Sequence, residues 1–278
     1  MNKAVFVTGG QGATGYAIAE FFASKGMNVF VGALDEKEAC AAAKKISDKY
    51  GVYAKGYECN LLNEKQINEV FDDIETTDYF VDTLILNAAD MALGSDPSKG
   101  LDVWTLPLEV FSRVIETNIA GNFAIARRAA ISMKERHHGA IVFISSNGVY
   151  RPNQNREAYL ASKGGINALA RCLAVDFGQY GIRSNTILPG TIKTERWVSM
   201  GKKQIVNGEM TPIGDISDFE DIANAAWYLG TDLSKNVTGA ELIVDGGMSC
   251  QLYPPMFNEL RALRDSIQEN ASNERSEL

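Results

Sequence analysis

Short apolar runs alternate along most of the chain with longer segments whose apolar residues recur at helical spacing. Apolar runs rich in valine and isoleucine are typical of strands that helices cover on both faces. The runs predict seven strands, at Ala4–Val7, Asn28–Gly32, Val52–Glu58, Thr83–Leu86, Ala140–Ser145, Ser184–Leu188 and Glu241–Val244. The intervening segments predict helices at about Thr14–Lys25, Glu36–Tyr50, Glu64–Glu75, Leu108–Glu135, Glu157–Gln179 and Asp218–Leu229. This alternation predicts an α/β fold, a doubly wound (Rossmann) parallel sheet of about seven strands with helices on both faces.

The predicted elements use residues 1–247 and leave no room for a separate substrate domain, so we expect one domain there. The segment of about residues 192–215 interrupts the alternation and is expected to form a lid loop, since long loops of this kind are often functional. Residues 248–278 are expected to form a C-terminal tail, with a helix at Phe257–Gln268 and a disordered polar end.

Composition narrows the function classes. The 278 residues carry a net charge of −8, which disfavours binding to nucleic acid or to an anionic membrane surface. No stretch approaches the roughly 18 apolar residues of a membrane span, and the first strand begins too early for a signal peptide. The four cysteines and two histidines show no metal-ligand spacing, so we expect no metal site. These features favour a soluble cytoplasmic protein.

A glycine-rich turn follows the first predicted strand and precedes the first helix, reading T-G-G-Q-G-A-T-G at residues 8–15. Gly10, Gly12 and Gly15 satisfy G-x-G-x-x-G, in which glycine lets the backbone approach a pyrophosphate at a helix N-terminus. The turn therefore predicts a dinucleotide site, with contacts from Gly9, Gln11, Gly12, Ala13, Thr14 and Gly15.

The end of the second predicted strand bears on the choice of dinucleotide. Asp35 could accept the hydroxyls of the adenosine ribose, or it could cap the following helix. A 2′-phosphate needs arginine or lysine, and Lys37 is the only cation nearby in the sequence. This balance favours NAD(H) over NADP(H).

Tyr159 and Lys163 are four residues apart on a predicted helix and therefore share one face. Ser146 follows a buried strand, at the edge where doubly wound sheets bind ligands. We expect the ammonium beside the phenol to lower its pKa, so that Tyr159 exchanges a proton with a substrate oxygen that the serine hydroxyl holds. Hydride transfer would belong to the dinucleotide.

Further motifs carry a resemblance to a known family. They are Asn87-Ala88-Ala89 after the fourth strand, Asn118 in T-N-I-A-G, Pro189-Gly190 with Ile192 and Thr194, and Val244-Asp245-Gly246-Gly247. Together with Ser146, Tyr159 and Lys163, they resemble the single-domain branch of the short-chain dehydrogenase/reductase family over about residues 3–247. Ala13 departs from that branch, and the glycine spacing also fits the larger branch with sugar-nucleotide epimerases, which usually has a bigger C-terminal region.

The resemblance implies a role for each matched residue. Tyr159 would be the general acid/base, Lys163 would lower its pKa and bind the nicotinamide ribose, Ser146 would orient the substrate carbonyl, and Asn118 would anchor a water in a proton relay to Lys163. Asn60 stands where the family commonly has an aspartate that binds adenine. The remaining cofactor contacts implied are Leu61, Asn87, Ala88, Ala89, Pro189, Gly190, Ile192 and Thr194. The resemblance also implies a homodimer or homotetramer, built from the helices with Asn118 and Tyr159 and from the last strand.

The loop between Ser146 and Tyr159 is the sequence's indication of the substrate. It is rich in hydrogen-bonding residues: Asn147, Arg151, Asn153, Gln154, Asn155 and Arg156. If these residues line the pocket rather than a solvated loop, they favour a small-molecule substrate such as a sugar, polyol or sugar acid. The reaction expected is interconversion of a secondary alcohol and a ketone. A steroid or 3-oxoacyl ketone reductase would use the same four residues and remains open, as do an epimerase or dehydratase and a non-catalytic dinucleotide-binding protein.

Overall fold

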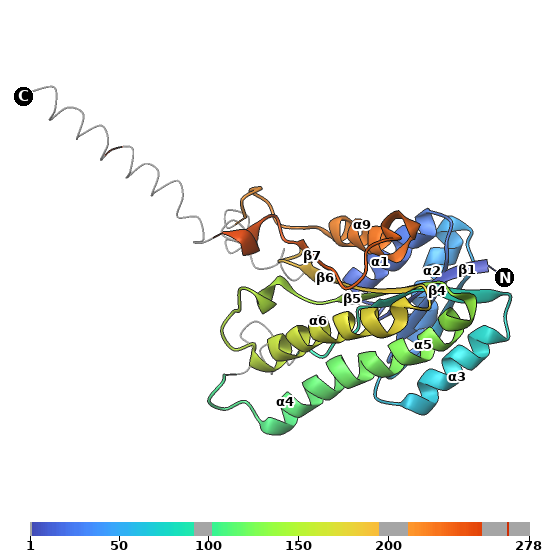
Figure 1. Ribbon diagram of the computed structural model, residues 1–278, viewed down its shortest axis with the longest axis horizontal. Helices are drawn as coiled ribbons and strands as arrows, with labels where there is room; N and C mark the ends of the chain where they lie inside the picture. Colours follow the sequence, from blue (N-terminus) through green and yellow to red (C-terminus); the bar gives the residue numbers. More distant parts are fainter. Residues whose placement is uncertain (1, 92–101, 195–210, 252–265, 267–278) are drawn as a thin grey trace, which may run out of the picture.

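The computed structural model describes residues 2–91, 102–194, 211–251 and 266. These residues contain a parallel sheet with the strand order β3-β2-β1-β4-β5-β6-β7 (Figure 1). The strands are β1 (Asn2–Thr8), β2 (Asn28–Ala33), β3 (Ala54–Glu58), β4 (Tyr79–Leu86), β5 (Gly139–Ile144), β6 (Ile182–Pro189) and β7 (Glu241–Val244). The order reverses between β1 and β4, because the chain crosses from β3 back over the sheet to β4. The predicted doubly wound α/β fold is confirmed.

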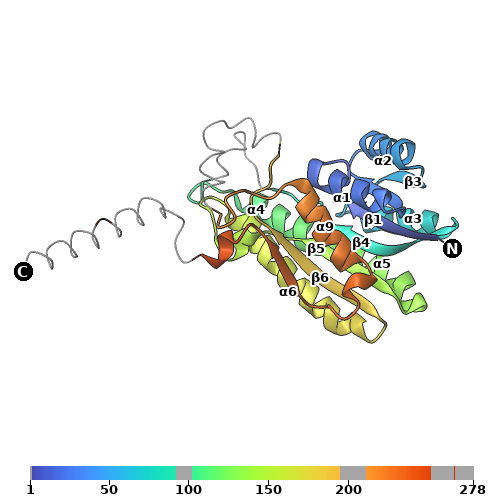
Figure 2. The same ribbon diagram turned by 90° about the horizontal axis from the view of Figure 1, so that it is seen from above.

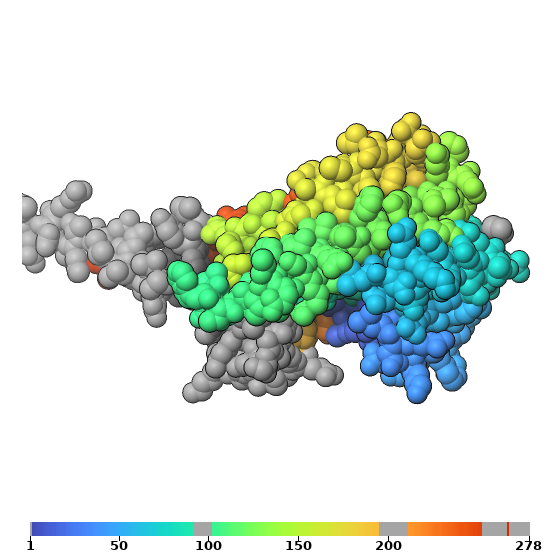
Figure 3. All heavy atoms as spheres, turned by 90° about the horizontal axis from the view of Figure 1, so that it is seen from below, coloured from blue at the N-terminus to red at the C-terminus, as the bar shows by residue number. Residues whose placement is uncertain are grey.

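Helices cover both faces of the sheet (Figures 1 and 2). Apolar side chains of α1, α2 and α9 form a core on one face, and those of α3, α5 and α6 form a core on the other. The bounds are α1 (Ala13–Ser24), α2 (Glu36–Tyr50), α3 (Glu64–Glu75), α4 (Leu108–Ile115), α5 (Asn122–Arg136), α6 (Glu157–Gly178) and α9 (Phe219–Gly230), with short 3₁₀ turns at Asn147–Val149, Asp232–Ser234 and Met248–Cys250. Seen from below, α3 to α6 make up much of one face of the molecule (Figure 3).

Local capping sets several helix ends. The Asp35 carboxylate accepts a hydrogen bond from the N–H of Glu38 at 3.0 Å and begins α2. Gly51 ends α2 in the left-handed region, with φ of 68°. Asn63 caps α3 in the same way as Asp35 caps α2. α2 and α3 therefore have the bounds that the sequence predicts.

The predicted continuous helix Leu108–Glu135 differs from the structure. A π-helical turn at Glu116–Gly121 separates α4 from α5 and contains Asn118. A β carbon at Gly121 would lie 2.8 Å from Cβ of Leu61, so the chain at the end of this turn passes close to the segment after β3. Such π turns insert one residue into a helix and often occur at functional sites.

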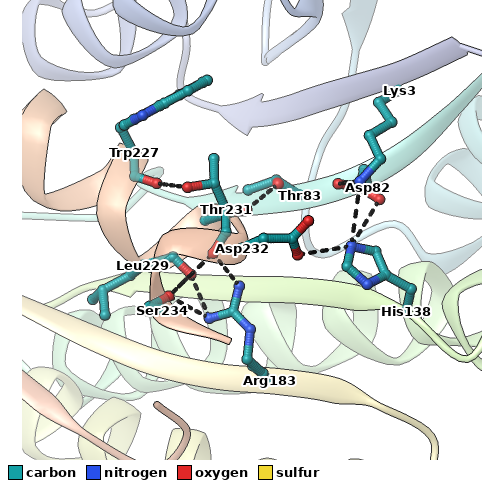
Figure 4. Close-up of polar contacts among 11 residues, drawn as sticks. Lys3, Asp82, Thr83, His138, Arg183, Trp227, Leu229, Thr231, Asp232 and Ser234 are labelled. Carbon is teal, nitrogen blue, oxygen red and sulfur yellow. Dashed lines mark hydrogen bonds and ion pairs between the residues drawn. The ribbon is translucent and has the colours of Figure 1, made fainter. Parts of the chain in front are cut away.

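An arginine joins three segments at the amino-terminal edge of the sheet (Figure 4). The guanidinium of Arg183, on β6, donates to the carbonyls of Leu229 at 2.7 Å and Thr231 at 2.9 Å, and to Oγ of Ser234 at 2.7 Å. These bonds satisfy carbonyls at the C-terminal end of α9. They fix this end of α9 against β6, at the edge opposite the glycine-rich turn.

Parts of two predicted features lie outside the described residues: 195–210 of the lid, and the tail from 252 on except Ser266. Both ends of the predicted lid segment are described, and a β-bridge joins Ile192 at its first end to Ser217, just beyond its second end. In the part of the chain that the structure describes, no helix is both long enough and apolar enough to cross a membrane.

Candidate active site

The glycine-rich turn and the segment after β4 are tied together where the strand order reverses. Oγ1 of Thr8 accepts the N–H groups of Asn87 at 3.0 Å and Ala88 at 3.1 Å. In return, Nδ2 of Asn87 donates to the carbonyls of Thr8 and Gly9, both at 3.2 Å. Doubly wound sheets bind ligands at this crevice, outside the carboxyl ends of the strands.

Gly9 and Gly15 of this turn have no space for a side chain. A β carbon at Gly15 would lie 2.2 Å from the carbonyl oxygen of Gly9, and Gly9 has φ of 63°. α1 begins at Ala13, and its first turn carries neither a side-chain cap nor an acidic residue. Its N–H groups and positive dipole end can therefore take an anion, which fits the predicted pyrophosphate site.

Beside this turn lies a cavity of about 580 Å³. Of the predicted cofactor residues, it brings together Gly9, Gln11, Asn60, Leu61, Asn87, Ala88 and Ala89. Its other described lining residues are Ala33, Leu34, Cys59, Leu62, Asp90, Arg113 and Thr117. One continuous hollow thus runs from the end of β2, past the glycine turn, to the start of the π-helical turn.

Several predicted cofactor residues are not among the described residues that line this cavity. Thr14 and Gly15 lie in the first turn of α1, and Asp35 uses a carboxylate oxygen to cap α2. Pro189, Gly190, Ile192 and Thr194 follow β6. The Gly190 N–H donates to the Val244 carbonyl at 2.9 Å, and a β carbon on Gly190 would lie 2.6 Å from Cβ of Asp245. The ribose contact of Asp35 stays a prediction, since the structure shows only the capping alternative.

Ser146, Tyr159 and Lys163 lie together at the carboxyl end of β5. The Ser146 hydroxyl lowers the pKa of the Tyr159 phenol, and its oxygen accepts the N–H of Gly148 at 3.1 Å. Nζ of Lys163 lies 5.5 Å from the centroid of the Tyr159 ring and donates to the Ile144 carbonyl at 2.7 Å. The predicted shared helix face is confirmed.

The pKa values of this group differ from the sequence expectation. Tyr159 as a residue is partly exposed, but its phenol oxygen is buried, and burial raises its pKa to about 12. The Arg156 guanidinium and the hydrogen bond from Ser146 oppose this rise. Burial also lowers the pKa of Lys163 to about 8. We expected Lys163 to lower the pKa of Tyr159, but burial raises it, because desolvation of the phenolate outweighs the opposing effects of Arg156 and Ser146.

Asn118 is fully buried within the π-helical turn. Its Oδ1 accepts the N–H of Asp90 at 2.7 Å, and its Nδ2 donates to the Asp90 carbonyl and to Oγ of Ser162, both at 2.9 Å. The Ser162 hydroxyl in turn donates to the carbonyl of Tyr159 at 2.7 Å. The side chain of Asn118 therefore links the segment after β4 to the helix that carries Tyr159 and Lys163.

Two arginines lie near the site, Arg113, which the sequence did not single out, and Arg156, which the sequence placed in the loop expected to line the substrate pocket. Nε of Arg113 forms an ion pair with Oδ2 of Asp90 at 2.8 Å, at the cavity wall. The guanidinium carbon of Arg156 lies 6.0 Å from the centroid of the Tyr159 ring. Arg113 follows Asp90 by 23 residues and could not be paired with it without the fold.

The chain combines a Rossmann-type sheet, a glycine-rich turn after its first strand, and a serine, tyrosine and lysine at the carboxyl end of β5, an arrangement typical of oxidoreductases that use a dinucleotide. A family model described as enoyl-(acyl carrier protein) reductase matches residues 11–249. The chain belongs to the short-chain dehydrogenase/reductase family.

Individual relatives match over nearly their whole length. A Thermotoga maritima protein described as an uncharacterized oxidoreductase is 33% identical over 257 residues, covering 90% of this chain and 97% of the relative. A Yarrowia lipolytica protein described as a probable NADP-dependent mannitol dehydrogenase is 30% identical, covering 90% and 88%. The crystal structure of an NAD⁺-bound xylitol dehydrogenase superposes with a TM-score of 0.78 at 25% identity, covering 88% and 98%. Relatives of this chain thus use both NAD and NADP.

Proposed function

We propose that this protein is an NAD(P)(H)-dependent oxidoreductase that interconverts a secondary alcohol and a ketone, with Tyr159 as general acid/base. The observation that carries the proposal is the grouping of Ser146, Tyr159 and Lys163 at the carboxyl end of β5, where hydrogen bonds through Asn118 link their helix to Asp90 in the cavity wall. The bound dinucleotide would supply or accept the hydride. The chain's own residues would manage the proton and the substrate oxygen.

Each of these residues has its own part in the proposal. At neutral pH Tyr159 holds its proton, because burial raises its pKa, and can donate it to a carbonyl oxygen during reduction. The Ser146 hydroxyl, which lowers the pKa of Tyr159, would hold the same oxygen. Lys163 would bind the nicotinamide ribose, and Asn118 would anchor a water leading to Lys163. Oxidation of an alcohol needs the tyrosinate, so its rate should increase with pH.

A polyol, sugar or sugar acid is the substrate class that we propose. Two of the relatives named above act by their descriptions on mannitol and xylitol. The loop after Ser146 adds Asn147, whose Nδ2 donates to Asp245 at 3.1 Å, and Arg156 beside the Tyr159 ring. Such hydrogen-bonding groups suit a hydroxylated or carboxylated molecule. The second candidate is a 3-oxoacyl ketone reductase, because an Aquifex aeolicus relative that is 30% identical over 249 residues is described as a 3-oxoacyl-[acyl-carrier-protein] reductase.

We propose NAD(H) as the preferred cofactor. At the end of β2 the described cavity wall consists of Ala33 and Leu34, which offer no charge to a 2′-phosphate. The cation in the described wall is Arg113, which is paired with Asp90. Titration with NADH and NADPH tests this preference, and tighter binding of NADPH would overturn it.

A homodimer or homotetramer is our proposal for the assembly. The helices expected to form the contact, α5 and α6, lie next to each other in Figure 3. They carry exposed apolar side chains, among them Ile131 and Val175, which are 54% and 80% exposed. Light scattering of the purified protein would test this, and a monomer would contradict it.

The central test is Tyr159→Phe, compared with Tyr180→Phe just beyond the end of α6. Absorbance of the reduced nicotinamide reports turnover against polyols, sugar acids, 3-oxoacyl ketones and steroids, with both cofactors. Tyr159→Phe should lose about 10³-fold or more in turnover, within the range for general acid/base groups, while NADH binding survives. Tyr180→Phe should remain active. Near-normal turnover of Tyr159→Phe would overturn the assignment, and product formation without net cofactor change would favour an epimerase.

A further inference from the structure

Asn122, the first residue of α5, lies directly after the π-helical turn and makes an unusual bond to it. Its Nδ2 donates to the main-chain carbonyl of Asn118 at 2.7 Å. Both residues are buried, at 1% and 0% exposure. A π turn shifts the register of helical hydrogen bonds. Here the side chain of Asn122 reaches the main-chain carbonyl of Asn118, which lies four residues earlier, within the turn. Asn122 thus contacts Asn118 through the main chain.

The remaining polar groups of the Asn118 side chain are already in use. They bind the main chain of Asp90 and the hydroxyl of Ser162, and Ser162 binds the carbonyl of Tyr159. A change in the direction of the Asn118 carbonyl would therefore be transmitted to the segment after β4 and to the helix of Tyr159.

Asn122 is a poor choice for stability alone. Its Oδ1 is buried and accepts no hydrogen bond from any protein group in the described part of the chain. A buried acceptor without a partner costs about 1–3 kcal/mol, whereas an apolar side chain of similar shape at that position would cost nothing of this kind. Residues that lower the stability of the fold in this way typically occur at functional sites.

We propose that Asn122 is a positioning residue for proton transfer. Its amide fixes the direction of the Asn118 carbonyl and so the position of Asn118 in the proposed relay toward Lys163. This inference rests on the proposed function, because it needs Tyr159 and Lys163 to handle a proton. It predicts that Asn122 affects the proton-transfer rate and leaves substrate and cofactor affinity unchanged.

The matched control is Asn167, on α6. It is also a buried asparagine, 4% exposed, with an Oδ1 that lacks a partner among the described groups. Its Nδ2 donates to Oε2 of Glu241 at 2.9 Å, at the edge strand β7. Asn122→Ala and Asn167→Ala each remove one comparable bond, so they should lose similar stability, and only the first touches Asn118.

The experiment measures kcat, KM, the solvent deuterium isotope effect and the pH profile of the wild type and variants, per folded protein. Asn122→Ala should lose about 10-fold or more in kcat, with KM nearly unchanged and a larger solvent isotope effect, since general acid/base steps contribute about 10²-fold or more. Asn167→Ala should keep the wild-type isotope effect. Asn122→Ser should recover most of kcat, because a helical serine can donate to the carbonyl four residues earlier.

The outcomes separate this inference from the proposed function. If Tyr159→Phe is inactive but Asn122→Ala matches Asn167→Ala in kcat and isotope effect, the positioning role is overturned and the proposed function stands. If Tyr159→Phe is fully active, the proposed function itself fails. If Asn122→Ala does not fold, the pair Asn122→Ser and Asn122→Asp decides. The aspartate carboxylate cannot donate to the Asn118 carbonyl, so equal kcat in these two variants would overturn the role.

Discussion

Lys163 is a buried ammonium, and its removal has a calculable effect on stability. The residue is 2% exposed, and burial lowers its pKa from 10.5 to about 8. The folded protein therefore binds this proton less tightly than the unfolded chain. The resulting penalty to stability is fully present below pH 8, decreases as pH rises, and is absent above 10.5. Lys163→Met removes the titrating group and with it this pH dependence.

The size of the effect follows from the shift. A decrease of about 2.5 pKa units corresponds to about 3 kcal/mol, from about 1.4 kcal/mol per unit. By linkage the penalty is about 3 kcal/mol at pH 7 and about 1 kcal/mol at pH 10. Lys163→Met also removes the hydrogen bond to the Ile144 carbonyl. That loss, about 1–3 kcal/mol, offsets the gain by the same amount at every pH in this window.

The assay is urea unfolding of the wild type and Lys163→Met at pH 7 and pH 10, at one protein concentration. The stability of the variant relative to the wild type should be about 2 kcal/mol more favourable at pH 7 than at pH 10, while turnover is lost. The control is Lys235→Met, at an exposed lysine whose charge stays in water in both states, and it should show no such difference. An equal stability difference at both pH values for Lys163→Met would refute the argument that its ammonium is held against a desolvation penalty.

Two further substitutions test the scaffold of the site. Gly15→Ala should lose more than 10-fold in NADH affinity as well as stability, because its β carbon would lie 2.2 Å from the Gly9 carbonyl oxygen. The control is Gly178→Ala, whose added carbon has no atom within 4 Å. Its NADH affinity should equal that of the wild type in a cofactor titration, and its thermal stability should be unchanged or higher. Arg183→Met should lose about 2–5 kcal/mol in urea unfolding with turnover per folded molecule retained, because its three hydrogen bonds lie at the edge opposite the site. A loss below about 1 kcal/mol would contradict the structural role given to Arg183.

The sequence predicts elements best where local chemistry decides their ends. α2 has the predicted bounds because Asp35 caps it and Gly51 terminates it in the left-handed region, and both signals are visible in the sequence. The sequence does not predict the π-helical turn at Glu116–Gly121. One inserted residue changes the spacing of apolar residues over Leu108–Glu135 too little to be distinguished from a continuous helix. Its close contact with Leu61 is made only after the chain has folded.

The site could be predicted as far as motif and strand order place it. The carboxyl ends of parallel strands lie at one edge of the sheet. Once the strand order is assumed, the sequence therefore predicts that Gly9 and Asn87 lie close together, as they do in the structure. The pairing of Asp90 with Arg113 does not follow, because it joins a loop and a helix through the tertiary fold. Asp35 shows the same limit, since the sequence allowed two uses of its carboxylate and only the structure shows the cap.

Burial also changes which residue adjusts the acidity of Tyr159. A desolvated phenol and a desolvated ammonium both favour their neutral forms, so burial raises the pKa of Tyr159 and lowers that of Lys163. The described groups that oppose the rise at Tyr159 are the Arg156 guanidinium, 6.0 Å from the ring, and the Ser146 hydroxyl. Sequence reasoning gave this adjusting role to Lys163. Because Arg156 and Ser146 are the groups that oppose the rise, we propose that they share this role, and that Lys163 binds the ribose and passes the proton.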